Sequence, residues 1–184
     1  LSSSSAASDV YKRQVYMAQD SGATVHCAGI NMSANQPAAQ AGSMTAEVLD
    51  HYEEGTWTIG VEFGGSATGI SINAGRNVGT YTKVGNRVFI TAWINLSDKG
   101  SQTGAATITG LPFTSLDSGG AITGIAIGYA DFSFADFPMI QGSADNVILH
   151  MYEVTNSGAV TTITDGNWSD STNLILSGHY PAAT

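Results

Sequence analysis

Apolar and polar residues alternate with a period of two along several short segments that begin at Trp57. In the segment WTIGVEF, this places four apolar residues on one face of an extended chain: Trp57, Ile59, Val61 and Phe63. Side chains alternate between two faces in a β-strand, so the segment predicts a half-buried strand. Turn-forming residues separate this run from similar ones at near-regular spacing, as in all-β sandwiches and barrels. These breakers are Gly64-Gly65, Gly85-Asn86, Asp98–Gly100, Gly110–Pro112, Ser118–Gly120, Asn156–Gly158 and Asp165–Asn167.

The segment NRVFITAWINL, residues 86–96, has apolar residues on both of its faces. The first face carries small and branched residues: Val88, Ile90, Ala92 and Ile94. The second face carries two aromatic rings around a hydroxyl: Phe89, Thr91 and Trp93. We predict an all-β, antiparallel, jelly-roll-like β-sandwich in which one face of this strand meets the core and the other meets a second chain. The preceding VGNRV predicts a tight hairpin, because Gly and Asn tolerate the positive φ of such turns.

Composition limits the partners of this chain. Only 11% of the 184 residues are charged, and the formal net charge is −9. An acidic surface repels phosphate backbones, so we expect no nucleic-acid partner. No apolar run approaches the ~20 residues of a membrane helix, so we expect no membrane insertion. The single cysteine, Cys27, excludes an intrachain disulfide and a C-x-x-C motif.

Residues 4–14, SSAASDVYKRQ, read as the in-frame translation of a transposase-type sequencing adapter. We therefore treat residues 1–14 as a non-native segment of an environmental sequence assembly, and expect the natural N-terminus to be missing. Residues 15–54 are rich in Ala, Gly, Ser, Gln and Asn, with too few large apolar residues to fold alone. We predict that they form an extended stem and neck, either as a linker or as part of a multi-chain stem in which neighbouring copies supply the missing core. We predict that residues 55–184 form the β-sandwich head. Without the first segment, the basic residues all fall between 76 and 99: Arg76, Lys83, Arg87 and Lys99.

Three segments resemble a known family. They are GINMSANQPAAQAGSMTAEVLDHYEEGTWT at 29–58, GTYTKVGNRVFITAWINLSDKG at 79–100 and TGAATITGLPFT at 103–114. They resemble the C-terminal head module of bacteriophage tail-fibre and tail-spike-like structural proteins, in which an LDDYEEGTWTP neck leads into a β-sandwich. His51 stands where the family has Asp, and Ile59-Gly60 replaces a proline-containing strand entry. The resemblance implies a homotrimeric fibre tip on the virion that contacts a host-surface receptor, frequently a glycan and otherwise a protein.

An acidic cluster precedes the first strand at the junction of neck and head. We predict that Asp50, Glu53 and Glu54 lie near Lys83 and Arg87 and hold neck to head or chain to chain. Each exposed pair would contribute only about 0.2–1 kcal/mol. The alternative is that the acids merely keep the junction solvated.

Two further residues complete the predicted junction. We expect Gly55 to take the left-handed conformation that turns the chain into the sheet. We expect Trp57 to close the base of the sandwich.

Catalytic patterns are weak. The histidines (His26, His51, His150 and His179) have no metal-ligand spacing, and the chain has no G-x-S-x-G elbow or phosphate loop. Asp131, Asp136 and Glu153 are carboxylates of the kind that hydrolyse glycosidic bonds when they face each other across a cleft. The sequence does not pair them, so we expect no enzymatic activity and keep glycan hydrolysis as an alternative.

Aromatic and acidic residues gather in one stretch and in one turn, and are the candidate receptor contacts. They are Tyr129, Asp131, Phe132, Phe134, Asp136, Phe137 and, in a polar turn, Trp168. Rings beside carboxylates can stack on sugars while the acids accept hydroxyl hydrogen bonds. The alternative, which we favour for Phe132 and Phe134, is a core strand or a trimer seam.

The turn DGNWSD partly imitates a calcium loop, because Asp165, Asn167 and Asp170 place oxygens at intervals. It lacks the glycine at position six and the glutamate at position twelve. A turn capped by its own Asp and Asn side chains explains it better, so we expect no metal and no cofactor. The sequence therefore favours a trimeric structural adhesin. A secreted carbohydrate-binding module and a glycan depolymerase remain alternatives.

Overall fold

The computed structural model describes residues 30–31, 48–49, 51–117 and 123–183. Most of the predicted stem, including Cys27 and Asp50, lies outside the described residues, as does segment 1–14. Within the stem, β1 (Ile30–Asn31) pairs with β2 (Val48–Leu49) in antiparallel fashion. The three domain limits therefore stay predictions.

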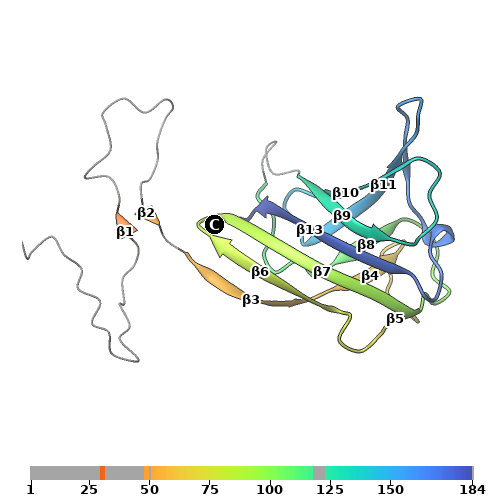
Figure 1. Cartoon of the computed structure of the whole chain (residues 1–184), viewed down its shortest axis with the longest axis horizontal. Helices are drawn as coiled ribbons and strands as arrows, with labels where there is room; N and C mark the ends of the chain where they lie inside the picture. The colour runs from red at the N-terminus through yellow and green to blue at the C-terminus, as the bar shows by residue number, and fades with distance from the viewer. Residues whose placement is uncertain (1–29, 32–47, 50, 118–122, 184) are drawn as a thin grey trace, which may run out of the picture.

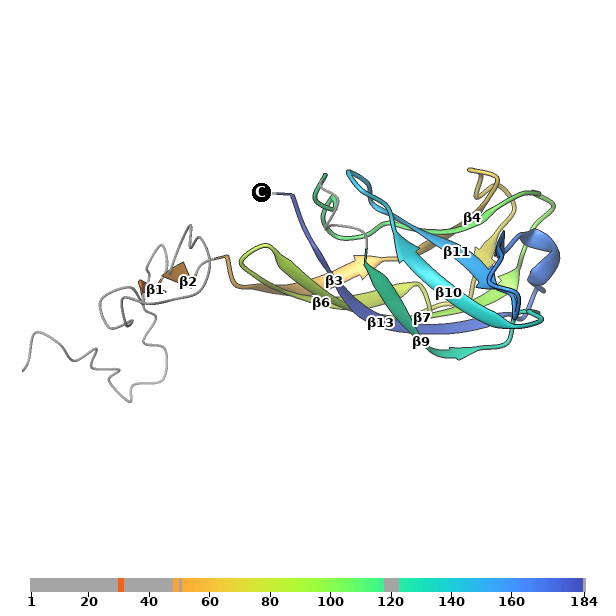
Figure 2. The ribbon, with the colours of Figure 1, turned by 90° about the horizontal axis from the view of Figure 1, so that it is seen from above.

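The head is built from two layers of antiparallel strands, visible edge-on in Figure 2. In spatial order, the first layer contains β3 (Glu53–Thr58), β6 (Val78–Val84), β7 (Arg87–Asp98), β13 (Asn173–Pro181) and β9 (Gly124–Ala130). The second contains β10 (Phe137–Gly142), β11 (Ile148–Val154), β8 (Ala106–Thr109) and β4 (Gly60–Phe63). Two short strands flank them, with β5 (Ser71–Ile72) on β7 and β12 (Val160–Thr162) on β11. A single 3-10 turn, η2 (Asp165–Asn167), is the helical element among the described residues. The predicted all-β antiparallel fold is confirmed.

Two strands carry the chain from one layer to the other. β3 and β4 lie at opposite ends of the strand order, although only Ile59 separates them in sequence. β9 pairs with β10 through Ile125 and with β13 through Tyr129. The predicted strand 57–63 is thus a strand that changes layers, and the sheet nearly closes on itself (Figure 1).

The core follows the alternation of the sequence. The predicted inward residues of 57–63 are each at most 5% exposed: Trp57, Ile59, Val61 and Phe63. On β7, the inward face is Val88, Ile90, Ala92, Ile94 and Leu96, and all are buried. Burying each large apolar side chain contributes roughly 1.5–3 kcal/mol. The close packing of the two layers therefore stabilises the head.

The indole of Trp57 lies over a glycine of the neighbouring strand. Gly79 is the cross-strand partner of Trp57, and a Cβ on Gly79 would come closer than 3.0 Å to the indole and to the backbone oxygen of Thr91. Only a residue without a side chain leaves this space for the ring. The predicted burial of Trp57 in the sandwich is confirmed.

The residue with a positive φ before β3, the first strand of the head, is not the one that the sequence predicted. Gly55 is an ordinary strand residue of β3, whereas His51 has a positive φ of 47°. Gly55 has a different role, because a Cβ there would lie 2.7 Å from Cε1 of Tyr81 and would displace that ring. The glycine makes room for the tyrosine ring across the strand pair.

The two ends of the head are built from different elements. β6 and β7 join through the predicted hairpin turn at Gly85, whose φ is 58°, and the N–H of Ala182 donates to the oxygen of Asn86. The start of β3, this turn and the C-terminus therefore lie at one end (Figures 1 and 2). The β9–β10 loop and η2 lie together at the opposite end, where the N–H of Ser133 donates to the oxygen of Asn167.

Candidate functional site

The outer face of the first layer gathers large apolar side chains that the core does not bury. Five of the exposed large hydrophobic residues lie on β6, β7, β13 and β9, each 38–53% exposed: Val78, Phe89, Trp93, Tyr129 and Ile175. We call this surface the outer face of the first layer. Its residues on β7 are the second apolar face that the sequence predicts.

Strand register brings these side chains together from distant parts of the chain. Ile175 on β13 pairs with Tyr129 on β9 and with Trp93 on β7. One row further along, Ser177 pairs with Thr91, which pairs with Thr80. The outer face therefore has an apolar row beside a row of hydroxyl groups.

Trp93 is held in place from two directions. The guanidinium carbon of Arg76 lies 3.5 Å from the centre of the Trp93 ring, which is a cation–π contact. The indole N–H of Trp93 donates to Oδ1 of Asn173 at 3.3 Å, and Nδ2 of Asn173 donates to Asp131 at 2.9 Å. These two contacts within the chain hold the Trp93 ring in position.

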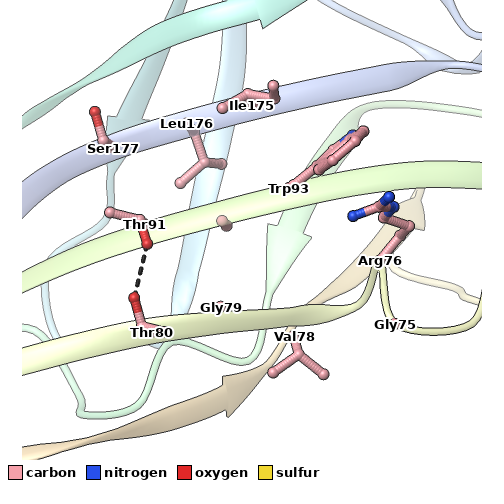
Figure 3. Close-up of a pocket in the computed structure, with 11 residues that line it drawn as sticks. Gly75, Arg76, Val78, Gly79, Thr80, Thr91, Trp93, Ile175, Leu176 and Ser177 are labelled. Carbon is pink, nitrogen blue, oxygen red and sulfur yellow. Dashed lines mark hydrogen bonds between the residues drawn. The ribbon is translucent and has the colours of Figure 1, made fainter.

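A hollow of about 380 Å³ lies between these groups. Figure 3 shows Arg76 and Trp93 at one end, and Thr80 and Thr91 further along, joined by a 2.8 Å hydrogen bond. The lining residues include no Asp, Glu, His or Cys. The guanidinium of Arg76 makes no hydrogen bond or ion pair among the described residues. This arrangement offers apolar contact, hydroxyl groups and one positive charge, which suit binding and give no pair of groups for catalysis.

Two of the predicted receptor contacts are core residues. Phe132 is 3% exposed and Trp168 is 4% exposed, and their rings stack with centroids 5.7 Å apart. Phe63 contacts Trp168 edge-on at 5.8 Å. The prediction that Trp168 is an exposed aromatic is wrong, because the polar turn around it folds its ring into the apolar interior. The interpretation of Phe132 as a core residue is confirmed, although it lies between β9 and β10 and not in a strand. The same interpretation of Phe134 is wrong, because its ring is 43% exposed, and a place in a trimer seam stays a prediction for it.

The remaining predicted contacts lie in two separate places. Phe134 is 43% exposed and Phe137 is 62% exposed, close to Asp136, which accepts a hydrogen bond from Nδ2 of Asn156 at 2.7 Å. Tyr129 and Asp131 instead belong to the region around Trp93. Contact of either group with a receptor stays a prediction.

The carboxylates considered for hydrolysis each hold a loop. Glu153 is 7% exposed and accepts hydrogen bonds from the backbone N–H groups of Ala135 at 2.7 Å and Asp136 at 2.6 Å. Asp131 accepts the backbone N–H of Asn173. These bonds fix the β9–β10 loop against β11 and β13.

The junction uses tyrosines where ion pairs were predicted. Glu53 is the cross-strand partner of Lys83, but its carboxylate accepts the hydroxyl of Tyr81. Glu54 accepts the hydroxyl of Tyr52. Each hydrogen bond raises the pKa of its tyrosine, since ionisation would put two negative charges together.

The two predicted cations make other contacts. Nζ of Lys83 lies 4.7 Å above the ring of Phe113, and Nη1 of Arg87 lies 3.4 Å from Nδ1 of His179. Over residues 51–117 and 123–183, neither forms an ion pair with Glu53 or Glu54. Glu53 thus lies across the strand pair from Lys83, as predicted, but the expected ion pairs do not form within the described part of one chain, and pairing between chains stays a prediction. The pairing of Asp50 lies outside the described residues.

The side-chain oxygens of the calcium-like turn accept hydrogen bonds from the backbone of the same chain. Asp165 accepts the N–H of Gly104 at 2.8 Å and lies 4.0 Å from Nζ of Lys99. Asp170 accepts the N–H of Lys99 at 3.0 Å, and Asn167 accepts the N–H of Thr164 at 2.9 Å. Among the described residues no three His, Cys, Asp or Glu side chains form a metal-binding group.

Comparison with known proteins shows a likeness of fold and no likeness of sequence to a described family. No protein-family model and no curated protein matches the sequence. The fold resembles part of the Dettilon tailspike protein (gp208). The likeness covers 72% of this chain and 24% of the tailspike chain, with a TM-score of 0.60 and 19% sequence identity. The chain thus shares the fold of about a quarter of that tailspike. In the described part of the chain, no helix has the length and hydrophobicity to cross a membrane.

Proposed function

We propose that this chain is the distal head of a phage tail fibre or tailspike, which assembles as a homotrimer on the virion and attaches to a host-surface glycan. Two observations support the phage tail: the neck and hairpin motifs between residues 29 and 114, and the fold likeness to a segment of a tailspike. In this proposal the head binds its receptor and catalyses no reaction on it.

The main support for a homotrimer is the group of exposed apolar side chains on the outer face of the first layer. Monomeric soluble proteins rarely expose large contiguous apolar patches, and such patches mark interaction sites. Trp, Tyr and Arg are the residues that contribute most often to binding energy at protein interfaces. Trp93, Tyr129 and Arg76 meet on this face, within a chain that has few charged residues. In a symmetric homotrimer, each subunit covers the same apolar face of its neighbour, so all three copies of this face are buried in the same way.

The mass of the full chain in solution tests this assembly. Light scattering is expected to give three times the 19.0 kDa of one chain. The double variant Trp93→Ser/Ile175→Ser removes two neighbouring members of the face and is expected to give a smaller mass at the same concentration. Val160→Ser is the matched control, because Val160 is 60% exposed on the other layer. A wild-type chain that stays monomeric at high concentration contradicts the proposal.

Two alternatives give different results. A secreted carbohydrate-binding module would bind glycan as a monomer. A glycan depolymerase would release oligosaccharides from host polysaccharide, and this release would be lost in Asp131→Asn or Asp136→Asn. The loop-holding hydrogen bonds of Asp131 and Asp136 favour the non-enzymatic head.

A further inference from the structure

The outer face of the second layer differs in chemistry from that of the first. Four outward residues form a row across four strands: Gln141 on β10, His150 on β11, Thr107 on β8 and Glu62 on β4. Their neighbours along β11, Leu149 and Met151, point into the core. The row therefore combines an amide, an imidazole, a hydroxyl and a carboxylate on one surface.

The polar groups of this row have no hydrogen-bonding partner in the part of the chain that the structure describes. Among the described residues, none of the four side chains makes a hydrogen bond or an ion pair. This contrasts with Asp131, Asp136 and Glu153, whose carboxylates each accept hydrogen bonds from neighbouring loops or strands. Half-exposed polar groups without internal partners are available to an external ligand.

Aromatic and apolar side chains adjoin the polar row. Tyr152 is two residues from His150 on β11, and the two rings lie 6.1 Å apart. Tyr152 pairs with Met139, and the next outward pair is Phe137 with Val154. Strands are spaced by about 4.8 Å, so a row across four strands extends over roughly 14 Å. Aromatic rings beside a row of donors and acceptors have the chemistry that binds the faces and hydroxyls of sugars.

The charge of the face selects among glycans. β4, β8, β10, β11 and β12 contain no Lys or Arg, and Glu62 is the one charged residue among their outward side chains. The whole chain has a formal net charge of −9. An acidic polysaccharide would meet like charge without a cation to pair with, so an uncharged one is favoured.

We propose that this face, centred on His150 and Tyr152, is the receptor-binding surface and takes a neutral polysaccharide of the host surface. The inference rests on the proposed function and specifies which surface of the head performs the attachment and for which class of glycan. The two outer faces belong to opposite layers of the sandwich. A trimer that covers the first layer therefore leaves the second layer open to a receptor.

An array of immobilised bacterial surface polysaccharides, some neutral and some containing uronic acids, tests the proposal with the full chain. Wild-type protein is expected to be retained on neutral polysaccharides. His150→Thr and Tyr152→Thr keep residues that favour strands, and each is expected to weaken retention by about tenfold or more. Phe134→Ser tests the competing prediction that the β9–β10 loop contacts the receptor. Phe134 is an exposed ring in that loop outside this face, so the proposal expects unchanged retention in this variant.

Light scattering on the same samples separates this inference from the proposed function. A trimer in wild type and in both β11 variants, with binding lost only in those variants, supports both. A trimeric wild type that is retained on no neutral polysaccharide, or only on acidic ones, overturns the receptor face while leaving the assembly intact. Loss of binding in Phe134→Ser, but not in the β11 variants, also overturns it and moves the site to the loop. Loss of the trimer in Tyr152→Thr overturns it too, because this face would then be the subunit seam.

Discussion

The substitution Gly79→Ala tests whether Trp57 closes the sandwich by lying over a glycine. A Cβ on Gly79 would come closer than 3.0 Å both to the Trp57 indole and to the carbonyl oxygen of Thr91. The indole can rotate only by leaving a buried position, and the carbonyl belongs to the backbone of β7. Neither contact can therefore be relieved by a flexible side chain.

The size of the effect follows from these two contacts. Inserting a methyl group into a packed core usually costs about 1–3 kcal/mol, and a clash with backbone belongs at or above the top of that range. We expect a loss of about 3 kcal/mol in the free energy of unfolding. In a domain of this size, such a loss lowers Tm by roughly 6–12 °C.

Urea unfolding followed by tryptophan fluorescence measures this loss, with all variants at one protein concentration because assembly adds to stability. Gly124→Ala is the matched control: Gly124 also lies in a strand, but nothing lies within 4 Å of its added Cβ. That variant is expected to be neutral or slightly stabilising, by up to about 1 kcal/mol. Equal stability of the Gly79→Ala and Gly124→Ala variants would refute the packing argument.

Three further predictions follow from contacts elsewhere in the head. Phe132→Ala removes a buried ring stacked on Trp168 and is expected to lower the free energy of unfolding, measured in urea, by about 3–5 kcal/mol. Phe134→Ala, at an exposed ring nearby, is expected to lower it by about 0.5 kcal/mol or less, and similar losses in the two variants would contradict the burial difference. Burial raises the pKa of Tyr180 to about 12 from 10.0, partly offset by the hydrogen bond that the backbone N–H of Phe113 donates to the tyrosine oxygen, so the folded state holds this proton more tightly. Stability is expected to fall as the pH rises from about 10 to about 12, and a Tyr180→Phe variant with an unchanged slope would show that another group is responsible. Glu153→Ala leaves the N–H groups of Ala135 and Asp136 without their acceptor, so it is expected to lower the free energy of unfolding by about 1–3 kcal/mol and to speed amide hydrogen exchange in the β9–β10 loop. Glu62→Ala removes a carboxylate that has no partner among the described residues, and is expected to change neither the stability nor the exchange.

Local pattern predicted the strands because side-chain alternation is a property of the extended backbone itself. The alternation at 57–63 put Trp57 and Phe63 on one inward face, and both are buried. At 86–96 it separated the face of Ile94 from that of Trp93 without selecting the core face, and the structure buries the face of Ile94. The turn at Gly85 was readable for the same reason, since two residues between two strands leave few backbone conformations.

The errors fall where local pattern competes with packing. Trp168 lies in a polar turn, yet the free energy of burying its ring against Phe132 and Phe63 draws it into the core. Gly55 precedes the strand as a turn residue would, yet its role is to leave space for Tyr81, and His51 takes the positive φ. Both outcomes depend on neighbours that are remote in sequence.

Which strands lie side by side was decided only by the tertiary structure. Trp93, Tyr129 and Ile175 meet because β13 inserts between β7 and β9, and the row from Glu62 to Gln141 forms because β11 lies between β8 and β10. Short-range sterics set the alternation of each strand, so the sequence by itself determined which residues share a face of a strand. Pairing between strands many residues apart depends on the free energy of the whole packed sandwich, so only the folded chain determined which outward residues share a surface.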